Sequence, residues 1–461
     1  MLKRHALLAV GLLSLTVATA VQAQDAWTVK PAWVSAHENF LASPALRGRG
    51  GATNDELVAA TYVASVFERY GLTHAPGMTG YLQTAPLVMT TPVGGASLTI
   101  GGVTVEQTGG LAVLSSSGGA VTGSVAVAEG EDPAAIPTAD FVLVAPPEGP
   151  TMRAWIRGAM QKGAKVVVLR ETQALKSLTA RAGRPSYAVA GEAGEDAGEA
   201  SPDFLVLAPE AFDRLKAAAT AGASAALSPA ASTKSEATTT NAIGWLEGSD
   251  PDAGVIMLSA HLDHLGMVDG VMMPGANDDA SGTAAVLELA HALAAGERPK
   301  RSVLFVAYGS EELGLLGSQY FAEHPPIPLE RIVANLEIEM IGQQDPNMPA
   351  GVMMMTGFDR SDFGPLLKSR GALVAPDPYP EQNFFQRSDN YSLALQGIVA
   401  HTVSGWATIP TYHSAEDTIA NLDIPFMTAA IQSLVEPLRA LVDGDFTPAW
   451  TATGRPTRTP R

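Results

Sequence analysis

Apolar and polar residues follow two different rhythms along the chain, and the change of rhythm divides it. Between residues 54 and 70 apolar side chains recur at helical spacing, and Gly71 follows them as a C-cap would. Residues 87–235 instead carry short β-like runs in a sequence rich in Gly, Ala, Ser, Thr and Val. Within them, 186–202 is predicted to be a surface loop and 228–240 a linker. We interpret 87–235 as an inserted small β-rich domain.

After residue 241 buried strands alternate with helices. The predicted strands are 255–260, 302–308, 332–341, 352–356 and 398–403, and the predicted helices are 283–295, 313–323, 362–370 and 424–442. This alternation predicts an α/β fold with a mostly parallel, doubly wound sheet and helices on both faces. Residues 24–86 and 236–445 would form this main domain, and 446–461 a disordered tail. In such sheets ligands bind beyond the carboxyl ends of the strands.

The N-terminus and the composition restrict compartment and partners. Residues 1–23 have the basic, apolar and small-residue order of a signal peptide, so we expect export to the periplasm or secretion, with Gln24 near the mature N-terminus. The absence of cysteine excludes disulfides, thiol catalysis and Cys-ligated zinc. A net charge of −18 disfavours nucleic acid or an anionic membrane as a partner. No membrane association is expected after signal removal.

The densest group of candidate ligands surrounds a pair of adjacent carboxylates, Asp278 and Asp279. Small residues flank this pair from Gly275 to Gly282, so backbone and ions can approach closely. His261 follows a predicted strand, and Asp263 could hold one nitrogen of its ring while the other binds a metal. Nitrogen and oxygen donors of this kind suit Zn²⁺. A polar turn capping the next helix is the alternative for the Asp pair.

Further acids lie after or within the next strands, and a histidine lies in a later loop. Glu311 and Glu312 are adjacent, so they point in different directions, and one could bind metal while the other serves as a general base. Glu337 and Glu339 share one face of an apolar strand, where a charge is costly unless it is paired or metal-bound. His413 lies in a turn-rich loop.

Taken in order, these motifs closely resemble the M28 family of zinc peptidases, whose members include bacterial aminopeptidases. The resemblance is strong from 241 to 442 and looser from 33 to 82, where Leu46-Arg47-Gly48-Arg49 also fits. The runs at 141–144 and 163–168 make the insert resemble a protease-associated domain.

The resemblance implies two zinc ions per chain. The ligands it assigns are His261, Asp278, Glu312, Glu339 and His413. Asp278 would bridge the ions, Glu311 would be the general base and Asp263 the supporting acid. The family usually has Asp where Glu339 stands, with Glu337 as the other candidate. Ser388 and Asp389 match a Ser-Asp pair of the family.

Two positions depart from the family pattern. Asn390 stands where His is common, and Phe385 stands where some members use Tyr to stabilise the oxyanion. Arg387 and Tyr412 are the candidate replacements.

The implied function is an exported metallo-aminopeptidase that hydrolyses N-terminal peptide bonds of peptides or proteins through a metal-bridging water and a Glu base. A carboxypeptidase or dipeptidase on the same scaffold is the main alternative. A glutaminyl cyclase-like acyltransferase uses one zinc, so the bridging Asp278 together with His413 argues against it. A non-catalytic binding protein would typically have lost ligands or the base.

Overall fold

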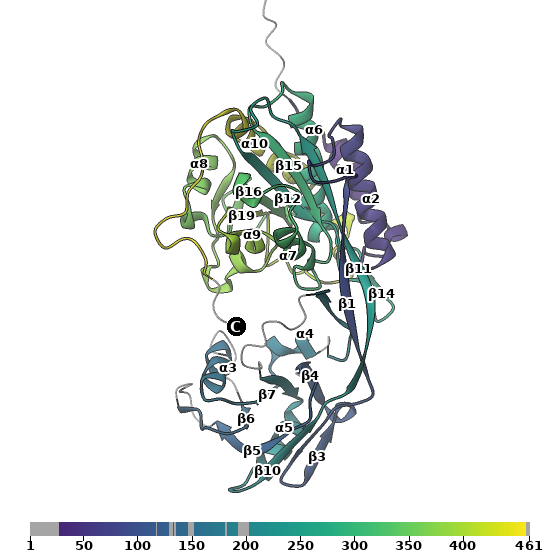
Figure 1. The fold of residues 1–461 in the computed structure, drawn as a ribbon, viewed down its shortest axis with the longest axis vertical. Helices are drawn as coiled ribbons and strands as arrows, with labels where there is room; N and C mark the ends of the chain where they lie inside the picture. The colour runs from purple at the N-terminus through teal and green to yellow at the C-terminus, as the bar shows by residue number, and fades with distance from the viewer. Residues whose placement is uncertain are drawn as a thin grey trace, which may run out of the picture.

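The structure is a computed structural model that describes residues 27–457, apart from 117, 129–131, 133–134, 146–151, 180–181 and 192–201. The fold is mixed α/β and is built around two sheets, one in each of two lobes stacked along the long axis of the molecule (Figure 1). The signal peptide predicted for residues 1–23 lies outside the described residues. Within the described part of the chain, no helix has the length and apolar character needed to span a bilayer.

The first sheet has nine strands in the order β18-β17-β19-β16-β12-β15-β11-β1-β8. Its centre is four parallel strands, β12 (Val255–His261), β15 (Ser302–Tyr308), β16 (Ile332–Glu339) and β19 (Val399–Ser404). Beside β19 lie β17 (Met353–Met355) and β18 (Val374–Pro376). Beside β15 lie the antiparallel strands β11 (Ala231–Leu246), β1 (Leu82–Val93) and β8 (Ser186–Val189). The parallel centre predicted from the sequence is therefore present.

Helices cover both faces of this sheet, so its central strands are buried on both sides. Along β12, Ile256 and Leu258 pack into one apolar core and Val255 and Met257 into the other. The first core also contains residues of α1 (Pro31–Leu41), α2 (Asn54–Arg69), α6 (Ser281–Ala295), α8 (Phe363–Ser369) and α10 (Ile424–Asp443). The second contains residues of α7 (Leu316–Glu323) and α9 (Asn390–Gln396).

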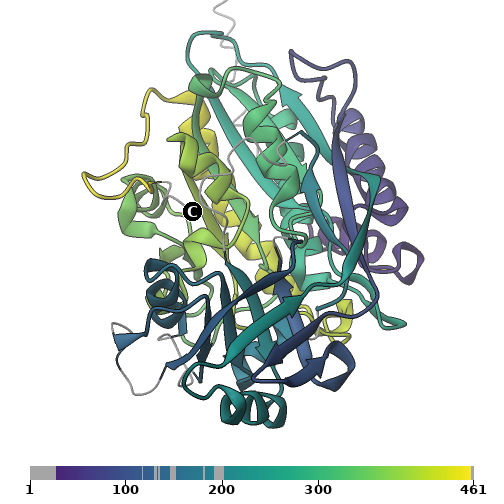
Figure 2. The same ribbon diagram turned by 60° about the horizontal axis from the view of Figure 1, so that its bottom comes forward.

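The second sheet has eight strands in the order β3-β2-β10-β5-β6-β7-β9-β4. They are β2 (Ser97–Ile100), β3 (Val103–Glu106), β4 (Leu111–Ser115), β5 (Val121–Ala128), β6 (Phe141–Val144), β7 (Val166–Arg170), β9 (Asp203–Leu207) and β10 (Ser224–Ser228). Helices α3 (Met152–Gln161) and α5 (Pro209–Ala218) contribute to its two separate cores, and α4 (Lys176–Thr179) is a single turn. Figure 2 shows this lobe in front of the first sheet.

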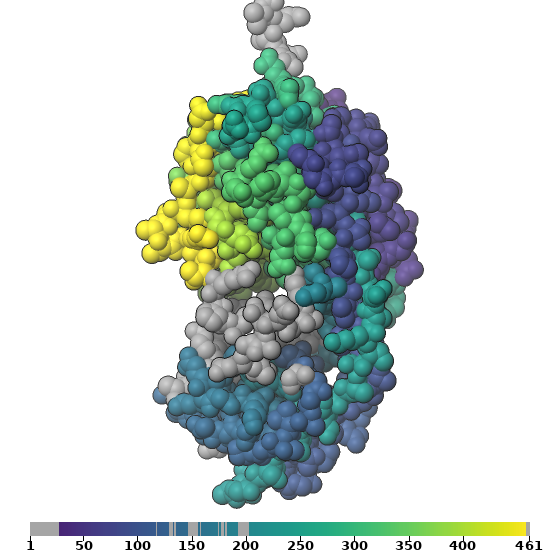
Figure 3. Space-filling view, in the orientation of Figure 1, coloured from purple at the N-terminus to yellow at the C-terminus, as the bar shows by residue number. Residues whose placement is uncertain are grey.

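A long antiparallel pair connects the lobes. Strands β1 and β11 pair without interruption from Leu82 opposite Ala242 to Val93 opposite Ala231. They run along one edge of the molecule from the first lobe to the second, as the ribbon and the space-filling view both show (Figures 1 and 3). The segment 228–240, predicted as a linker, thus lies largely in β11, and part of the loop predicted over 186–202 forms β8, which pairs with β1.

Residues 446–457 also differ from the disordered tail predicted over 446–461. Trp450 forms a β-bridge with Ser361, and its indole Nε1 donates to the carbonyl of Gly397 at 2.9 Å. Its ring lies 5.3 Å from that of His401. Because Trp450 has apolar partners and a satisfied indole N–H, this part of the tail packs on the first lobe.

Candidate metal centre

The candidate ligands meet at the carboxyl ends of the parallel strands. His261 and Glu339 are the last residues of β12 and β16, while Glu311 and Glu312 follow β15. Adjacent parallel strands end at the same edge of the sheet, so residues far apart in sequence become neighbours there. Asp278 comes from the segment just before α6, where its peptide bond to Asp279 is cis.

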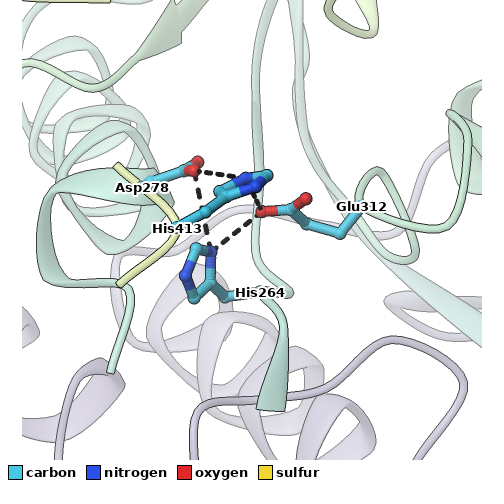
Figure 4. Close-up of side chains that lie close together, drawn as sticks. All are labelled: His264, Asp278, Glu312 and His413. Carbon is cyan, nitrogen blue, oxygen red and sulfur yellow. Dashed lines mark ion pairs between the residues drawn. The ribbon is translucent and has the colours of Figure 1, made fainter. Parts of the chain in front are cut away.

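Four side chains converge on one point, as Figure 4 shows: His264, Asp278, Glu312 and His413. His413 Nε2 lies 3.2 Å from Asp278 Oδ2 and 2.9 Å from Glu312 Oε1. His264 Nδ1 lies 2.9 Å from the same Glu312 oxygen and 3.7 Å from Asp278 Oδ2. Two ligands of a tetrahedral zinc at ~2.0 Å would lie about 3.3 Å apart, so these separations fit one ion.

A second group lies on the other side of Asp278. His261 Nε2 is 3.3 Å from Asp278 Oδ1 and 3.8 Å from Glu339 Oε1. Asp278 therefore directs one carboxylate oxygen at each group. The five candidate ligands named from the sequence are therefore all brought together. Glu312 and His413 belong to the first group, His261 and Glu339 belong to the second, and Asp278 belongs to both.

Burial supports a metal at this place. His261 is fully buried and Asp278 is 2% exposed. Among the described residues, His261 Nε2, Asp278 Oδ2 and Glu312 Oε1 have no hydrogen-bond partner. Buried polar atoms without partners are costly, and a zinc ion would satisfy these imidazole and carboxylate donors. The residues present thus fit the group.

Contacts with neighbouring histidines lower the pKa values of the two buried acids Asp278 and Glu312. Burial opposes ionisation of Asp278, but contacts with His261 and His413 outweigh it and hold its pKa well below the usual range. Burial and the charge of Asp278 oppose ionisation of Glu312, yet contacts with His264 and His413 lower its pKa to about 2. Both carboxylates are therefore ionised at neutral pH, as metal ligands must be.

Asp263 holds the turn that carries the two glutamates. Its Oδ1 accepts the backbone N–H of Glu311 at 2.9 Å and its Oδ2 that of Glu312 at 3.4 Å. The expected hold on His261 is weaker, since Asp263 Oδ1 is 3.8 Å from His261 Nδ1, beyond hydrogen-bond distance. Ser310, with a left-handed φ of 52°, turns the chain just before Glu311.

Two further acids hold the backbone around Asp278. Asp417 accepts the N–H groups of Asn277 at 2.8 Å and Asp278 at 3.0 Å. Asp279 accepts the N–H groups of Gly282 and Met340, at 2.8 and 2.9 Å. Asp279 therefore connects the start of α6 to the end of β16 and lies outside both ligand groups.

Sequence reasoning missed His264 and Asp417. The signal for His264 was available in the run His261-Leu262-Asp263-His264, which places a second histidine one residue after the supporting acid. Glu337, the other candidate for the strand acid, lies outside both groups and accepts a hydrogen bond from Ser388 Oγ at 3.0 Å. Glu339 is the strand acid that reaches the centre.

A small pocket with a cavity volume of about 30 Å³ adjoins the Glu339 side of the centre. Its lining residues are Glu339, Met340, Met354, Thr356, Phe384, Arg387, Thr402, Ser404, Ala407 and Tyr412. The Tyr412 ring stacks on that of His413 at 3.7 Å. Phe385 instead packs beside His401, and Asn390 donates to the carbonyls of Phe385 and Ala400, so neither lines the pocket. Tyr412 and Arg387, the two candidate replacements for the missing Tyr, both line the pocket.

Arg49 fastens the segments that carry the ligands. Its buried guanidinium donates to the carbonyls of Leu262 at 2.8 Å, Pro274 at 2.8 Å and Gly275 at 2.8 Å, and to that of Leu41 at 2.7 Å. It thereby joins the loop after β12 to the loop before Asp278.

We expect Arg49→Met to lower the free energy of unfolding by about 3–5 kcal/mol, the scale of removing one member of a buried charged network. Four buried carbonyls would lose their donor, and the fully buried Glu38 would lose the nearby positive charge. Urea denaturation measures the change. Arg47→Met is the matched control, because the Arg47 side chain is 65% exposed and should contribute less than about 1 kcal/mol. Equal effects of the two substitutions would contradict this role.

Comparison with known proteins places this site in a family context. A sequence model of peptidase family M28 matches residues 241–436. The chain is similar to leupeptin-inactivating enzyme 1 of Streptomyces exfoliatus, with 33% identity over 214 residues, 41% of this chain and 46% of that protein. It is also similar to an aminopeptidase of Pseudomonas aeruginosa, with 39% identity over 127 residues, 27% of this chain and 22% of that protein. The matched segments span less than half of either relative.

The fold has solved counterparts over most of its length. The structure of BSAP, a zinc aminopeptidase from Bacillus subtilis, superimposes with a TM-score of 0.58 at 17% identity, covering 93% of this chain and 97% of that one. At this identity the likeness concerns the fold. The likeness extends over 93% of this chain, so it includes residues of both lobes.

Proposed function

We propose that the chain is an exported two-zinc aminopeptidase of peptidase family M28, whose model matches residues 241–436, and that it hydrolyses N-terminal peptide bonds. One observation carries the proposal. The two oxygens of Asp278 face two separate groups, with Oδ1 3.3 Å from His261 Nε2 and Oδ2 3.2 Å from His413 Nε2. A carboxylate in this position suits two ions at once, and paired metal sites are typical of hydrolases such as aminopeptidases.

Each ligand role follows from the group to which the side chain belongs. His261 and Glu339 would hold one zinc, Glu312 and His413 the other, and Asp278 both. When bound, the ions would supply Lewis-acid polarisation of the substrate carbonyl and a lowered pKa for the attacking water.

Glu311 is the proposed general base. It stands beside Glu312 on the turn held by Asp263, and burial raises the pKa of its carboxyl well above the usual range. A carboxylate with a raised pKa accepts a proton more readily at neutral pH, and it can then protonate the leaving amine. Asp263 would act as a positioning residue, because its carboxylate fixes the backbone of Glu311 and Glu312.

The pocket beside Glu339 is the proposed position of the substrate's first side chain. Met340, Met354, Phe384 and Ala407 give it an apolar lining, which favours an apolar residue. A free α-amine would be held by the acids of the centre. Tyr412 stacks on His413 and lines this pocket, and its phenol O–H would donate to a developing oxyanion. Residues 87–235 are proposed to be a protease-associated domain inserted between the two parts of the peptidase domain.

Arg387 is the reason to test a carboxypeptidase alternative. It is the cation among the described residues that line the pocket, and it lies over the Phe384 ring at 4.9 Å. A guanidinium there could bind the free C-terminal carboxylate of a substrate. The substrate would then be held by its C-terminus, and the acids would not need to bind its α-amine.

The test of end preference uses one peptide series with an apolar first residue, in free, N-acetylated and C-amidated forms. We expect N-acetylation to lower kcat/KM at least on the order of 10²-fold, because a buried acid would lose its amine partner. C-amidation should have little effect. Chelation should abolish hydrolysis and added Zn²⁺ should restore it. Arg387→Ala is the control, which should lower the rate without changing the end that is attacked.

Three results would contradict the aminopeptidase. Release of C-terminal residues from the N-acetylated peptide would favour the carboxypeptidase. Ammonia and a pyroglutamyl product from a peptide beginning with Gln would favour an acyltransferase. Metal binding without turnover of any peptide would favour a non-catalytic protein.

A further inference from the structure

We propose that His264 is a fourth protein ligand of the ion held by Asp278, Glu312 and His413, so that the two metal positions are unequal. One position would then be closed by four protein ligands. The other, at His261, Asp278 and Glu339, would have three and would keep an open coordination position. This inference rests on the proposed metal centre and assigns different functions to its two positions.

The geometry places His264 within the first group, although its Nδ1 is farther from Asp278 Oδ2, at 3.7 Å, than His413 Nε2 is, at 3.2 Å. Its Nδ1 is 2.9 Å from Glu312 Oε1, the same separation as that between His413 Nε2 and that oxygen. All four ligand atoms lie within 4.8 Å of one another. The rings of His264 and His413 meet edge to face, at 71° with centroids 5.6 Å apart, so both can direct a nitrogen at one point without stacking (Figure 4).

Apart from its ion pairs with Glu312 and Asp278, the ring of His264 has no polar partner among the described residues. The side chain is fully buried, and neither Nδ1 nor Nε2 has a hydrogen-bond partner among the described residues. A buried imidazole that forms no hydrogen bond loses the interactions it had with water. An ion bound at Nδ1 would compensate for that loss on the side where Glu312 and Asp278 lie.

The backbone is shaped to hold this ring in place. The N–H of His264 donates to the carbonyl of Arg49 at 3.1 Å, and residue 264 forms a parallel bridge with Gly50. Gly275 leaves the space that the ring occupies, because a Cβ there would lie 2.5 Å from His264 Cγ. Gly275 also has a φ of 60°, a conformation that side chains other than glycine rarely adopt. Gly275 is therefore needed both for the backbone conformation of the turn and for the space that the His264 ring occupies.

The number of protein ligands distinguishes the two positions chemically. Zinc sites with four protein ligands are typically closed and structural, while catalytic sites have three and bind water or substrate at the next position. We therefore infer that the first ion stays bound through turnover. Substrate and water would exchange at the His261 side, next to the pocket lined by Glu339 and Tyr412.

The experiment is a metal titration of the full-length chain after chelation, with a chromophoric chelator as competitor. We expect two binding steps whose affinities differ by at least about 10-fold. His264→Asn should weaken the tighter step by at least about 100-fold, which is the upper end of the cost of losing an outer-shell partner. His261→Asn should weaken the other step. The exposed His324 gives the matched control, His324→Asn, which should leave both steps unchanged.

X-ray absorption of the unsubstituted protein loaded with one equivalent of Zn²⁺ tests the same idea without relying on a variant to fold. Two imidazole ligands, from His264 and His413, are expected at that loading. A single imidazole, or an isotherm of His264→Asn that matches the unsubstituted protein, would overturn the role of His264 and leave the aminopeptidase proposal standing. Binding of no metal by the unsubstituted protein would instead overturn the metal centre itself.

Discussion

Asp278→Asn is expected to remove metal from both positions at once. Both candidate groups contain this carboxylate, and its two oxygens lie 3.3 Å from His261 Nε2 and 3.2 Å from His413 Nε2. An amide keeps the shape of the side chain but loses the negative charge that both ions share. We therefore expect metal content near zero and a loss of activity greater than about 100-fold, because a direct ligand should cost more than an outer-shell partner.

The matched control for this substitution is Glu337→Gln. Glu337 is also a buried carboxyl residue, but it lies outside both groups and accepts a hydrogen bond from Ser388. Metal analysis of the purified variants should find unchanged content in Glu337→Gln. Full metal content in Asp278→Asn would show that the carboxylate does not bridge two ions. Loss of metal from Glu337→Gln would return that residue to the ligand set in place of Glu339.

The ligand-bearing positions were predictable from the sequence because they depend on local order. His261 and Glu311 follow apolar strands, so the strand pattern alone locates them at one edge of a parallel sheet, whereas Glu339 was one of two acids within a predicted strand and was favoured over Glu337 by the family resemblance. The contact of Asp417 with Asn277 and Asp278 spans about 140 residues, as its hydrogen bonds show. No periodicity within either segment predicts such a contact.

Two interpretations of local motifs were incomplete for a related reason. The His-x-Asp spacing suggested that Asp263 holds the imidazole of His261, but the carboxylate is directed at the N–H groups of Glu311 and Glu312 instead. The turn after β15 determines which groups the Asp263 carboxylate contacts, because it brings the backbone N–H groups of Glu311 and Glu312 close to that carboxylate. His264 was missed because the run from His261 to His264 was interpreted only as a His-x-Asp motif, which leaves out the histidine that follows the acid.

The strands that join the lobes were hidden by their composition. Much of β11 is Ser, Thr and Ala, and its first six residues are exposed, so it lacks the apolar alternation that marks a half-buried strand. Its pairing with β1 supplies the hydrogen bonds that make it a strand. Such pairing is a non-local property, whereas the four buried central strands carry their own apolar signal.

Glu311→Gln is expected to separate catalysis from metal binding. Glu311 belongs to neither ligand group, while its neighbour Glu312 lies 2.9 Å from both His264 Nδ1 and His413 Nε2. The amide cannot take a proton from the attacking water, so kcat should fall by a factor on the order of 10²–10⁴. Metal content and thermal stability should stay close to those of the unsubstituted protein, because the turn is held by backbone N–H groups that donate to Asp263.

Glu312→Gln is the matched control for that experiment, since it changes the adjacent side chain in the same way. Its charge is a partner of two histidines, and those contacts outweigh burial and the charge of Asp278 to lower its pKa to about 2. Loss of this charge should weaken metal binding at the His413 position and leave the His261 position occupied. Metal analysis and kcat measured on the same preparations distinguish the two roles. If Glu311→Gln lost metal while Glu312→Gln kept it, the base and the ligand would have to be exchanged.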